Sequence, residues 1–222
     1  ADTLDGQDGT YYLDYVRNKY KKCYGGDFLD CQKARADSFH KTEMHEIVQW
    51  GFDNPALDRN IVDTDFYRDV QGWFDNKMSG YYAWKSFIIY DLMKQINDGD
   101  LIVYWDCNPM YPDFKYSFAN SINTIVSNYD MIAGLQFGMK QKHWTKRDCF
   151  NLMNCKDKKY WKGRRQIQAS WTIWKKTKHT QNIIRDFFNF SKNENIIRCD
   201  LESITGKEST QFLEHRHDQS IL

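Results

Sequence analysis

The apolar residues of this 222-residue chain repeat with two periods that alternate along the sequence. Short stretches rich in aromatic and β-branched residues predict strands at 10–16, 45–52, 101–105, 130–138 and 165–174. Stretches with apolar residues three and four positions apart predict helices at 27–41, 79–100, 114–127, 145–153 and 179–192. Residues 54–78 predict loop and a short helix. Strands that alternate with helices predict a single α/β sandwich with a mainly parallel central sheet.

The strongest helix pattern covers residues 79–100. Ser79 can cap its start, and the sequence Asn-Asp-Gly at 97–99 predicts its end. Its apolar face is formed by Ile89, Leu92, Met93 and Ile96. A strand at 101–105 follows directly, so this part of the chain predicts a helix packed beside the strand that it leads into.

The strand at 101–105 ends in Asp106-Cys107-Asn108. Side chains at positions i and i+2 of an extended chain point the same way, so the oxygens of Asp106 and Asn108 can converge on one hard cation. In parallel sheets ligands gather at the carboxyl ends of strands, which is where Asp106 is expected. The alternative is an Asx turn that closes the strand, with Asn108-Pro109 as its start.

The segment 214–222, "EHRHDQSIL", holds a second group of polar side chains. His215 or His217 could contact a metal or a phosphate, and Asp218 could orient or deprotonate a hydroxyl. The alternative is an ordinary polar helix start, in which Asp218 interacts favourably with the helix dipole.

The segment "GYYAWK" (80–85) places aromatic residues beside a lysine. Tyr82 and Trp84 could stack on a base or a sugar ring while Lys85 contacts a phosphate. Packing of the aromatic residues in the core is the alternative. The sequence contains no G-x-G-x-x-G, Walker A or G-x-S-x-G motif.

Composition narrows the class of protein. The chain is 41% hydrophobic and 16% aromatic, which favours a packed globule, and its formal charge is only +1. A nucleic-acid-binding protein usually has a clear basic excess, so no nucleic-acid partner is expected. No run of about 20 apolar residues predicts a membrane span. The six cysteines show no zinc-ligand spacing, which favours reduced thiols and a cytoplasmic location.

Four segments occur in a characteristic order: "SGYYAWKSFIIYDLMKQINDGDLIVYWDCN", "WTKRDCF", "QIQASW" and "HRHDQSI". This series resembles a group of GT-A-fold glycosyltransferases found in capsule and surface-polysaccharide loci and in large DNA viruses of algae. The resemblance runs from about residue 79 to the end of the sequence. It implies a single catalytic domain over residues 1–222, cut from a longer chain, with the GT-A fold.

The resemblance also implies roles for particular residues. Asp106 would reach the donor's ribose and a Mn²⁺ or Mg²⁺ ion, with Asn108 as its weaker partner and His217 or His215 completing the contacts. Asp218 would be the catalytic residue that faces the acceptor hydroxyl. The donor and acceptor clefts would be lined by Lys85, Tyr82, Trp84, Arg147 and Gln168. The partners would be a nucleotide-sugar donor and a glycan or glycoprotein acceptor.

Two positions depart from the group's pattern. Ser86 stands where the group commonly has proline, and Asn108 stands where the wider superfamily has the second Asp of its D-x-D motif. The second change leaves one charge fewer for a cation.

Two other functions stay open from the residues alone. A metal-dependent hydrolase could use the His/Asp cluster at 214–222 to bind its ion, and it would bind metal without a nucleotide. A non-catalytic carbohydrate-binding module could grip glycan with its aromatic side chains, and it would have no affinity for nucleotides.

Overall fold

The computed structural model of the chain describes residues 48, 50–51, 58–74, 80–106, 127–155, 157 and 163–222. The chain divides into two compact units: the first is made of residues 1–80 and 106–128, and the second of residues 81–105 and 129–222. The strand expected at 10–16 and the helix expected at 27–41 lie outside the described residues, as does nearly all of the helix expected at 114–127. A single domain over residues 1–222 stays a prediction.

The described part of the first unit is small. Strands β1 (Trp50–Gly51) and β2 (Arg59–Asn60) pair in parallel, and the short helices η2 (Ile61–Asp63), α3 (Asp65–Val70) and η3 (Gln71–Trp73) follow. Thr64 caps α3, because its side chain accepts a hydrogen bond from the backbone N–H of Tyr67. Ile61, Phe66 and Val70 are buried. The short helix predicted within 54–78 is therefore confirmed.

The second unit is built on a three-stranded sheet with the order β3-β5-β4. Its strands are β3 (Leu101–Trp105), β4 (Met131–Lys140) and β5 (Arg165–Lys175). β5 lies between the other two and runs antiparallel to both, with Ile173 opposite Val103 on one side and Ile132 on the other. All three strands lie where the sequence predicts them.

The predicted mainly parallel central sheet is wrong, and with it the α/β/α sandwich of the GT-A type. Alternating strands and helices indicate which segments are extended, but the pattern contains no information on strand direction. The prediction assumed crossover connections between parallel neighbours, whereas β5 is inserted in reverse between β3 and β4. The rule about carboxyl ends of parallel strands therefore cannot be used to locate a site at Asp106.

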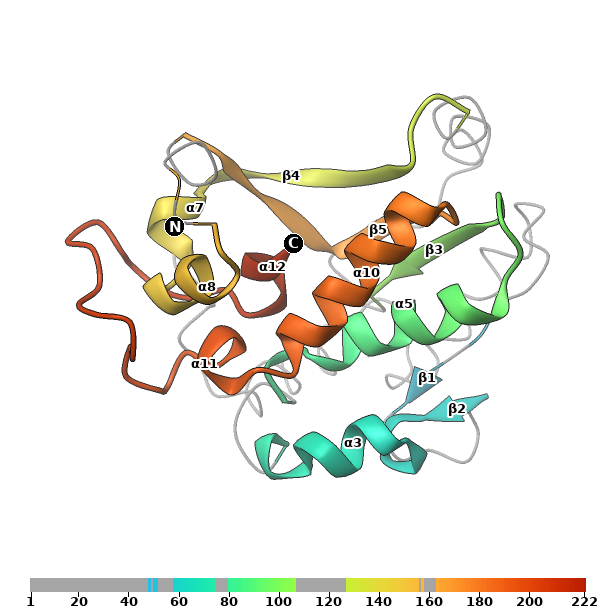
Figure 1. Cartoon of the computed structure of the whole chain (residues 1–222), viewed down its shortest axis with the longest axis horizontal. Coiled ribbons are helices and arrows are strands. Elements are labelled where there is room, and N and C mark those ends of the chain that lie inside the picture. Colours follow the sequence, from blue (N-terminus) through green and yellow to red (C-terminus); the bar gives the residue numbers. More distant parts are fainter. Residues whose placement is uncertain are drawn as a thin grey trace, which may run out of the picture. The chain divides into compact units, whose positions relative to one another are not determined.

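Two long helices lie side by side in the second unit, as Figure 1 shows for α5 (Trp84–Gln95) and α10 (Lys178–Ser191). The rings of Tyr90 and Phe188 stack between them, 4.7 Å apart. Thr177 forms a capping box with Thr180, which fixes the start of α10 close to its predicted position. None of the helices in the described part of the chain has the length and apolar character needed to cross a membrane.

Four short helices complete the described part of the second unit: α7 (Gln141–Trp144), α8 (Arg147–Leu152), α11 (Glu194–Ile197) and α12 (Asp218–Ile221). α12 packs on β5, and α11 packs on α8 (Figure 1). The short helix predicted at 145–153 corresponds to α8. These short helices place the segment 214–222 against the sheet.

The first residues of the helix predicted at 79–100 do not continue α5. Tyr81 and Tyr82 have φ angles of 55° and 60°, in the left-handed region, so α5 begins only at Trp84. Residues with a Cβ rarely adopt this conformation, and the apolar pattern gives no signal of it.

Candidate functional site

Two segments that are far apart in the sequence meet in the second unit. The Nζ atom of Lys85 lies 3.5 Å from a carboxylate oxygen of Asp218, and both side chains are more than nine-tenths buried. The ring of His217 lies 5.4 Å from the ring of Tyr81 and 6.2 Å from that of Tyr82. We call these five residues the Lys85–Asp218 cluster.

The backbone of this cluster is strained. Four residues other than glycine have a positive φ in the described part of the chain, and three of them belong to the cluster: Tyr81, Tyr82 and His217, with φ angles of 55°, 60° and 50°. Each such residue costs on the order of 1–3 kcal/mol and persists only where surrounding contacts hold it. Strain of this kind concentrates at functional sites, so it singles out the cluster as the candidate site.

Tyr81 is held in its strained conformation by Asp200 and Arg198. Asp200 lies near its hydroxyl, and the Arg198 guanidinium lies 5.6 Å from the centre of its ring. Arg198 in turn grips Asp200 with two hydrogen bonds of 3.1 and 2.9 Å. Burial, together with the nearby carboxylate of Asp200, raises the pKa of Tyr81 to about 12, so its hydroxyl keeps its proton at neutral pH.

Lys85 lies among aromatic rings. Its Nζ atom is 5.0 Å from the centre of the Tyr82 ring and 5.9 Å from that of the Trp84 ring. Ring faces attract a cation, and the attraction is strongest where water is excluded. The aromatic segment at 80–85 therefore does surround its lysine, but the anion beside Lys85 is the carboxylate of Asp218.

His217 presents one ring nitrogen that can accept a hydrogen bond. Its Nδ1 atom lies 3.0 Å from the carbonyl oxygen of Ile197, and a carbonyl can only accept, so Nδ1 carries the proton. Burial lowers the pKa of His217 to about 4, which keeps the ring neutral at neutral pH. Nε2 therefore has a lone pair for a hydroxyl or a cation.

His215 has the opposite arrangement. Its Nδ1 atom accepts a hydrogen bond of 3.2 Å from the backbone N–H of Lys146, so its proton lies on Nε2. Burial lowers its pKa well below the usual value. Its ring packs edge-on against that of His217, 5.7 Å away. Of the two histidines, His217 presents Nε2 as a hydrogen-bond acceptor, and the ring of His215 packs against the ring of His217.

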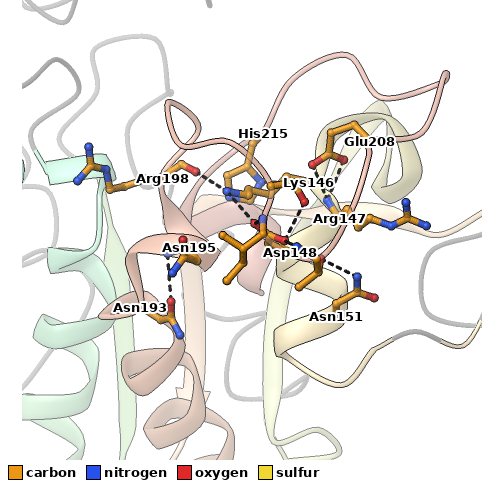
Figure 2. A network of polar contacts seen from close by, with 12 residues as sticks. Lys146, Arg147, Asp148, Asn151, Asn193, Asn195, Arg198, Glu208 and His215 are labelled. Atoms are coloured by element: carbon orange, nitrogen blue, oxygen red, sulfur yellow. Dashed lines mark hydrogen bonds and ion pairs between the residues drawn. The ribbon is translucent and has the colours of Figure 1, made fainter.

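Asp148 is the centre of a buried polar network next to His215 (Figure 2). Its carboxylate accepts hydrogen bonds from the Ser203 hydroxyl at 2.8 Å and from the backbone N–H groups of Ile204 and Thr205 at 3.0 and 2.9 Å. Burial by itself would raise the pKa of Asp148, but the hydrogen bonds from Thr205, Ser203 and Ile204 outweigh it and lower the pKa. The charged carboxylate of Asp148 thus anchors residues 203–205, which precede His217 and Asp218 in the chain.

Residues 199–216 have no regular structure, and we call this segment the strap. Hydrogen bonds attach it to α7 and α8 along its length: Glu208 accepts from the backbone N–H of Arg147 at 2.9 Å, and Leu213 donates to His143 at 2.8 Å. Lys146 lies next to these contacts. It forms an ion pair of 3.6 Å with Asp148 in α8 and donates a hydrogen bond of 3.1 Å to the carbonyl of Arg198, the residue before the strap (Figure 2). The strap thereby fixes where His217 and Asp218 lie.

Gln166, fully buried on β5, holds the other side of α12. Its amide nitrogen lies 2.9 Å from the carbonyl oxygen of Trp144 and 3.1 Å from the hydroxyl of Ser220. Its carbonyl oxygen accepts a hydrogen bond of 2.7 Å from Gln219. The strap holds the chain that precedes Asp218, and Gln166 binds Gln219 and Ser220, which follow it.

The structure brings together some of the predicted site residues and separates others. Tyr82, Trp84, Lys85, His217 and Asp218 lie in or beside the cluster, with His215 in contact with His217.

Arg147 is exposed, and its guanidinium donates to the carbonyl of Lys207 in the strap. Gln168 lies on β5 against Gly134, and no hydrogen bond or ion pair joins either residue to the cluster. Asp106 belongs to the first unit and is half-buried, and Asn108 lies outside the described residues.

The described ranges contain no group of three or more His, Cys, Asp or Glu side chains placed to hold a metal ion. A Mn²⁺ or Mg²⁺ site at Asp106 and Asn108 stays a prediction. Three of the six cysteines fall within the described residues, Cys149, Cys155 and Cys199, and these are free thiols.

Sequence reasoning missed three residues that support the cluster: Lys146, Asp148 and Gln166. All three lie inside the quoted segments "WTKRDCF" and "QIQASW". From these segments the sequence predicted Arg147 and Gln168 as the site residues instead. The available signal was a lysine and an aspartate within one short helical segment, together with a glutamine on a strand whose other residues are mostly apolar. Such polar residues in an apolar setting are expected to be buried and hydrogen-bonded.

A scan of protein-family models and searches of curated proteins and of solved structures find no match to this chain.

Proposed function

We propose that this protein is a glycosyltransferase that moves a sugar from a nucleoside-diphosphate donor to a hydroxyl of a glycan or glycoprotein. The observation that carries the proposal is the contact between two of the segments on which the resemblance rests. "GYYAWK" and "HRHDQS" meet through the Lys85–Asp218 pair and the Tyr81–His217 ring contact.

The cluster contains groups that suit sugar transfer. In an inverting reaction the acceptor oxygen attacks the anomeric carbon, the bond from that carbon to the diphosphate breaks, and its electron pair leaves with the nucleoside diphosphate. The acceptor proton needs a base, and Asp218 is the carboxylate that we propose for it. The neutral His217 can accept a hydrogen bond from a second sugar hydroxyl through Nε2, and tyrosine rings beside it can pack on a sugar.

The donor is expected to lie at Asp106, where a bound Mn²⁺ or Mg²⁺ ion would offset the charge of the departing diphosphate. We propose that the protein acts in a reducing compartment such as the cytoplasm, because its cysteine pattern favours free thiols.

Thermal unfolding against a panel of nucleotide sugars, with and without Mn²⁺ or Mg²⁺, tests the proposal. A ligand at 100 times its Kd stabilises the fold by about 2.7 kcal/mol, which is an easily measured shift in Tm. A shift with one nucleotide family would support the transferase and give its donor class. A shift with metal alone would favour the hydrolase, and a shift with glycans alone would favour the binding module.

Two variants test where the donor binds and which residue takes the acceptor proton. Asp106→Ala should abolish donor binding, and a variant that keeps its donor affinity in the presence of Mn²⁺ would show that the donor binds elsewhere. Asp218→Asn should bind donor normally and slow transfer by about 100-fold or more. Asp186→Asn, on the exposed side of α10, is the matched control for the loss of one carboxylate.

A further inference from the structure

We infer that Lys85 is a positioning residue that acts through Asp218, and that the group bound beside this pair is a neutral sugar hydroxyl and not the donor's diphosphate. The assignment of a reaction rests on the proposed function. The pairing itself rests on the geometry of the two side chains.

The first argument is burial. The side chains of Lys85 and Asp218 are 9% and 5% exposed, and their charged atoms lie 3.5 Å apart. A buried carboxylate without a nearby cation is strongly unfavourable, and removing one partner of a buried pair typically costs about 3–5 kcal/mol. Lys85 therefore favours an ionised carboxylate at the buried start of α12.

The second argument is the electrostatic surroundings of the ammonium. The contacts of Nζ include the carboxylate of Asp218 and the faces of the Tyr82 and Trp84 rings, which present negative potential to a cation. A diphosphate close enough to contact Lys85 would also approach the carboxylate of Asp218. Repulsion between like charges is strong at such distances where water is excluded. A neutral hydroxyl meets no such repulsion and can donate its hydrogen bond to the carboxylate.

The third argument is the orientation of Asp218. Residues on either side of it are fixed by hydrogen bonds: Gln219 donates to Gln166 at 2.7 Å, and the ring of His217 is tied to the carbonyl of Ile197 at 3.0 Å. With the backbone held in this way, the ion pair with Lys85 is one of the contacts that orient the carboxylate. Lys85 thus contributes to the positioning of the group that takes the acceptor proton.

The test compares donor binding with turnover in Lys85→Met and Lys85→Arg, once the panel has identified a donor. Lys85→Met should change the donor's Kd by less than about threefold but lower the single-turnover rate by about 100-fold, because only the transfer step needs an oriented Asp218. Lys85→Arg should recover part of that rate, since it restores the positive charge. Lys94→Met, on the exposed face of the same helix, should change neither quantity.

The double variant Lys85→Met/Asp218→Asn removes both charges, so it keeps the test valid if Lys85→Met alone does not fold. If Lys85 acts through Asp218, the double variant is no slower than Asp218→Asn and binds donor as well as the wild type. A tenfold loss of donor affinity in either Lys85→Met variant would overturn the inference and leave the proposed function intact. Failure of the wild type to bind any nucleotide sugar would overturn the proposed function, and the inference with it.

Discussion

The side-chain amide of Gln219 donates a 2.7 Å hydrogen bond to the buried carbonyl oxygen of Gln166, which joins α12 to the central strand of the sheet. The amide nitrogen of Gln166 lies within hydrogen-bond distance of Trp144 and Ser220. One fully buried side chain therefore links β5, α7 and α12, the helix that begins at the candidate catalytic residue Asp218.

Gln166→Leu should lower the free energy of unfolding by about 2–3 kcal/mol, because it removes the hydrogen bonds that this buried amide makes with Trp144, Ser220 and Gln219. The same substitution two residues along β5, Gln168→Leu, is the control. The side chain of Gln168 is half-buried and makes no hydrogen bond within the described part of the chain, so its loss should cost less than about 1 kcal/mol. Urea unfolding of both variants measures the difference, and equal losses would contradict the linking role of Gln166.

Asp148→Asn should destabilise the protein by about 3 kcal/mol at neutral pH, because it leaves Lys146 buried without its carboxylate. The folded protein lowers the pKa of Asp148, so ionisation of this carboxyl stabilises the folded state relative to the unfolded state. That contribution is fully present above the usual range of a carboxyl, about pH 4, and is lost as the pH falls through the folded pKa.

The stability gap between the wild type and Asp148→Asn should therefore narrow below about pH 4. Urea unfolding at a series of pH values measures this gap. Asp186→Asn, at an exposed ion pair, should show a small and nearly constant gap. A gap for Asp148→Asn that stays equally wide in acid would mean that the charge of Asp148 does not stabilise the fold.

Gly134→Ala should destabilise the fold by about 1 kcal/mol, because the Trp171 indole must give way while the end of the Gln168 side chain can move aside. A Cβ at this position would lie 2.7 Å from the Gln168 side-chain oxygen and 3.3 Å from the Trp171 indole. Adding Gln168→Ala to this variant should recover little of the loss, since the contact with Trp171 remains. Gly72→Ala, where a Cβ meets no atom within 4 Å, should be close to neutral in the same unfolding measurement.

Tyr82→Asn should lower stability much less than Tyr90→Asn. Tyr82 has a φ of 60°, a conformation that asparagine adopts more readily than tyrosine, so relief of strain offsets the lost ring contacts. Tyr90 lies within α5 and stacks on Phe188, so its replacement only removes packing. Thermal unfolding should separate the two by about 1 kcal/mol or more, and similar losses would mean that residue 82 carries no strain.

The local pattern was enough to find most elements of the second unit. The apolar run at 101–105 and the alternation at 165–174 predicted β3 and β5 to within a residue, and the helical spacing at 179–192 predicted α10. Each of these signals depends on neighbours a few positions away. Strand direction depends on how connections run in space, so the reverse placement of β5 could not be derived.

The candidate site was predictable in part for the same reason. The density of titratable groups at 214–222 pointed to His217 and Asp218, and the segment at 80–85 pointed to Lys85, but no spacing rule shows that the two segments meet. Alternation along β5 could not distinguish the buried Gln166 from the half-buried Gln168. Local propensity does not predict the left-handed conformation of Tyr81 and Tyr82, and the contacts of Tyr81 with Arg198 and Asp200 come from a distant part of the chain.

The attachment of the strap to α8 also sets an order of events in folding. The groups that donate to Asp148 follow it by 55 to 57 positions in the chain, so α8 can form long before its carboxylate has partners. Contacts between residues this far apart in the chain cost more loop-closure entropy than the local contacts of a helix, so they tend to form later. We expect a late step in which the strap docks, Asp148 becomes buried, and His217 and Asp218 reach Tyr81 and Lys85. Activity, on this view, would be the last property that a refolding molecule regains.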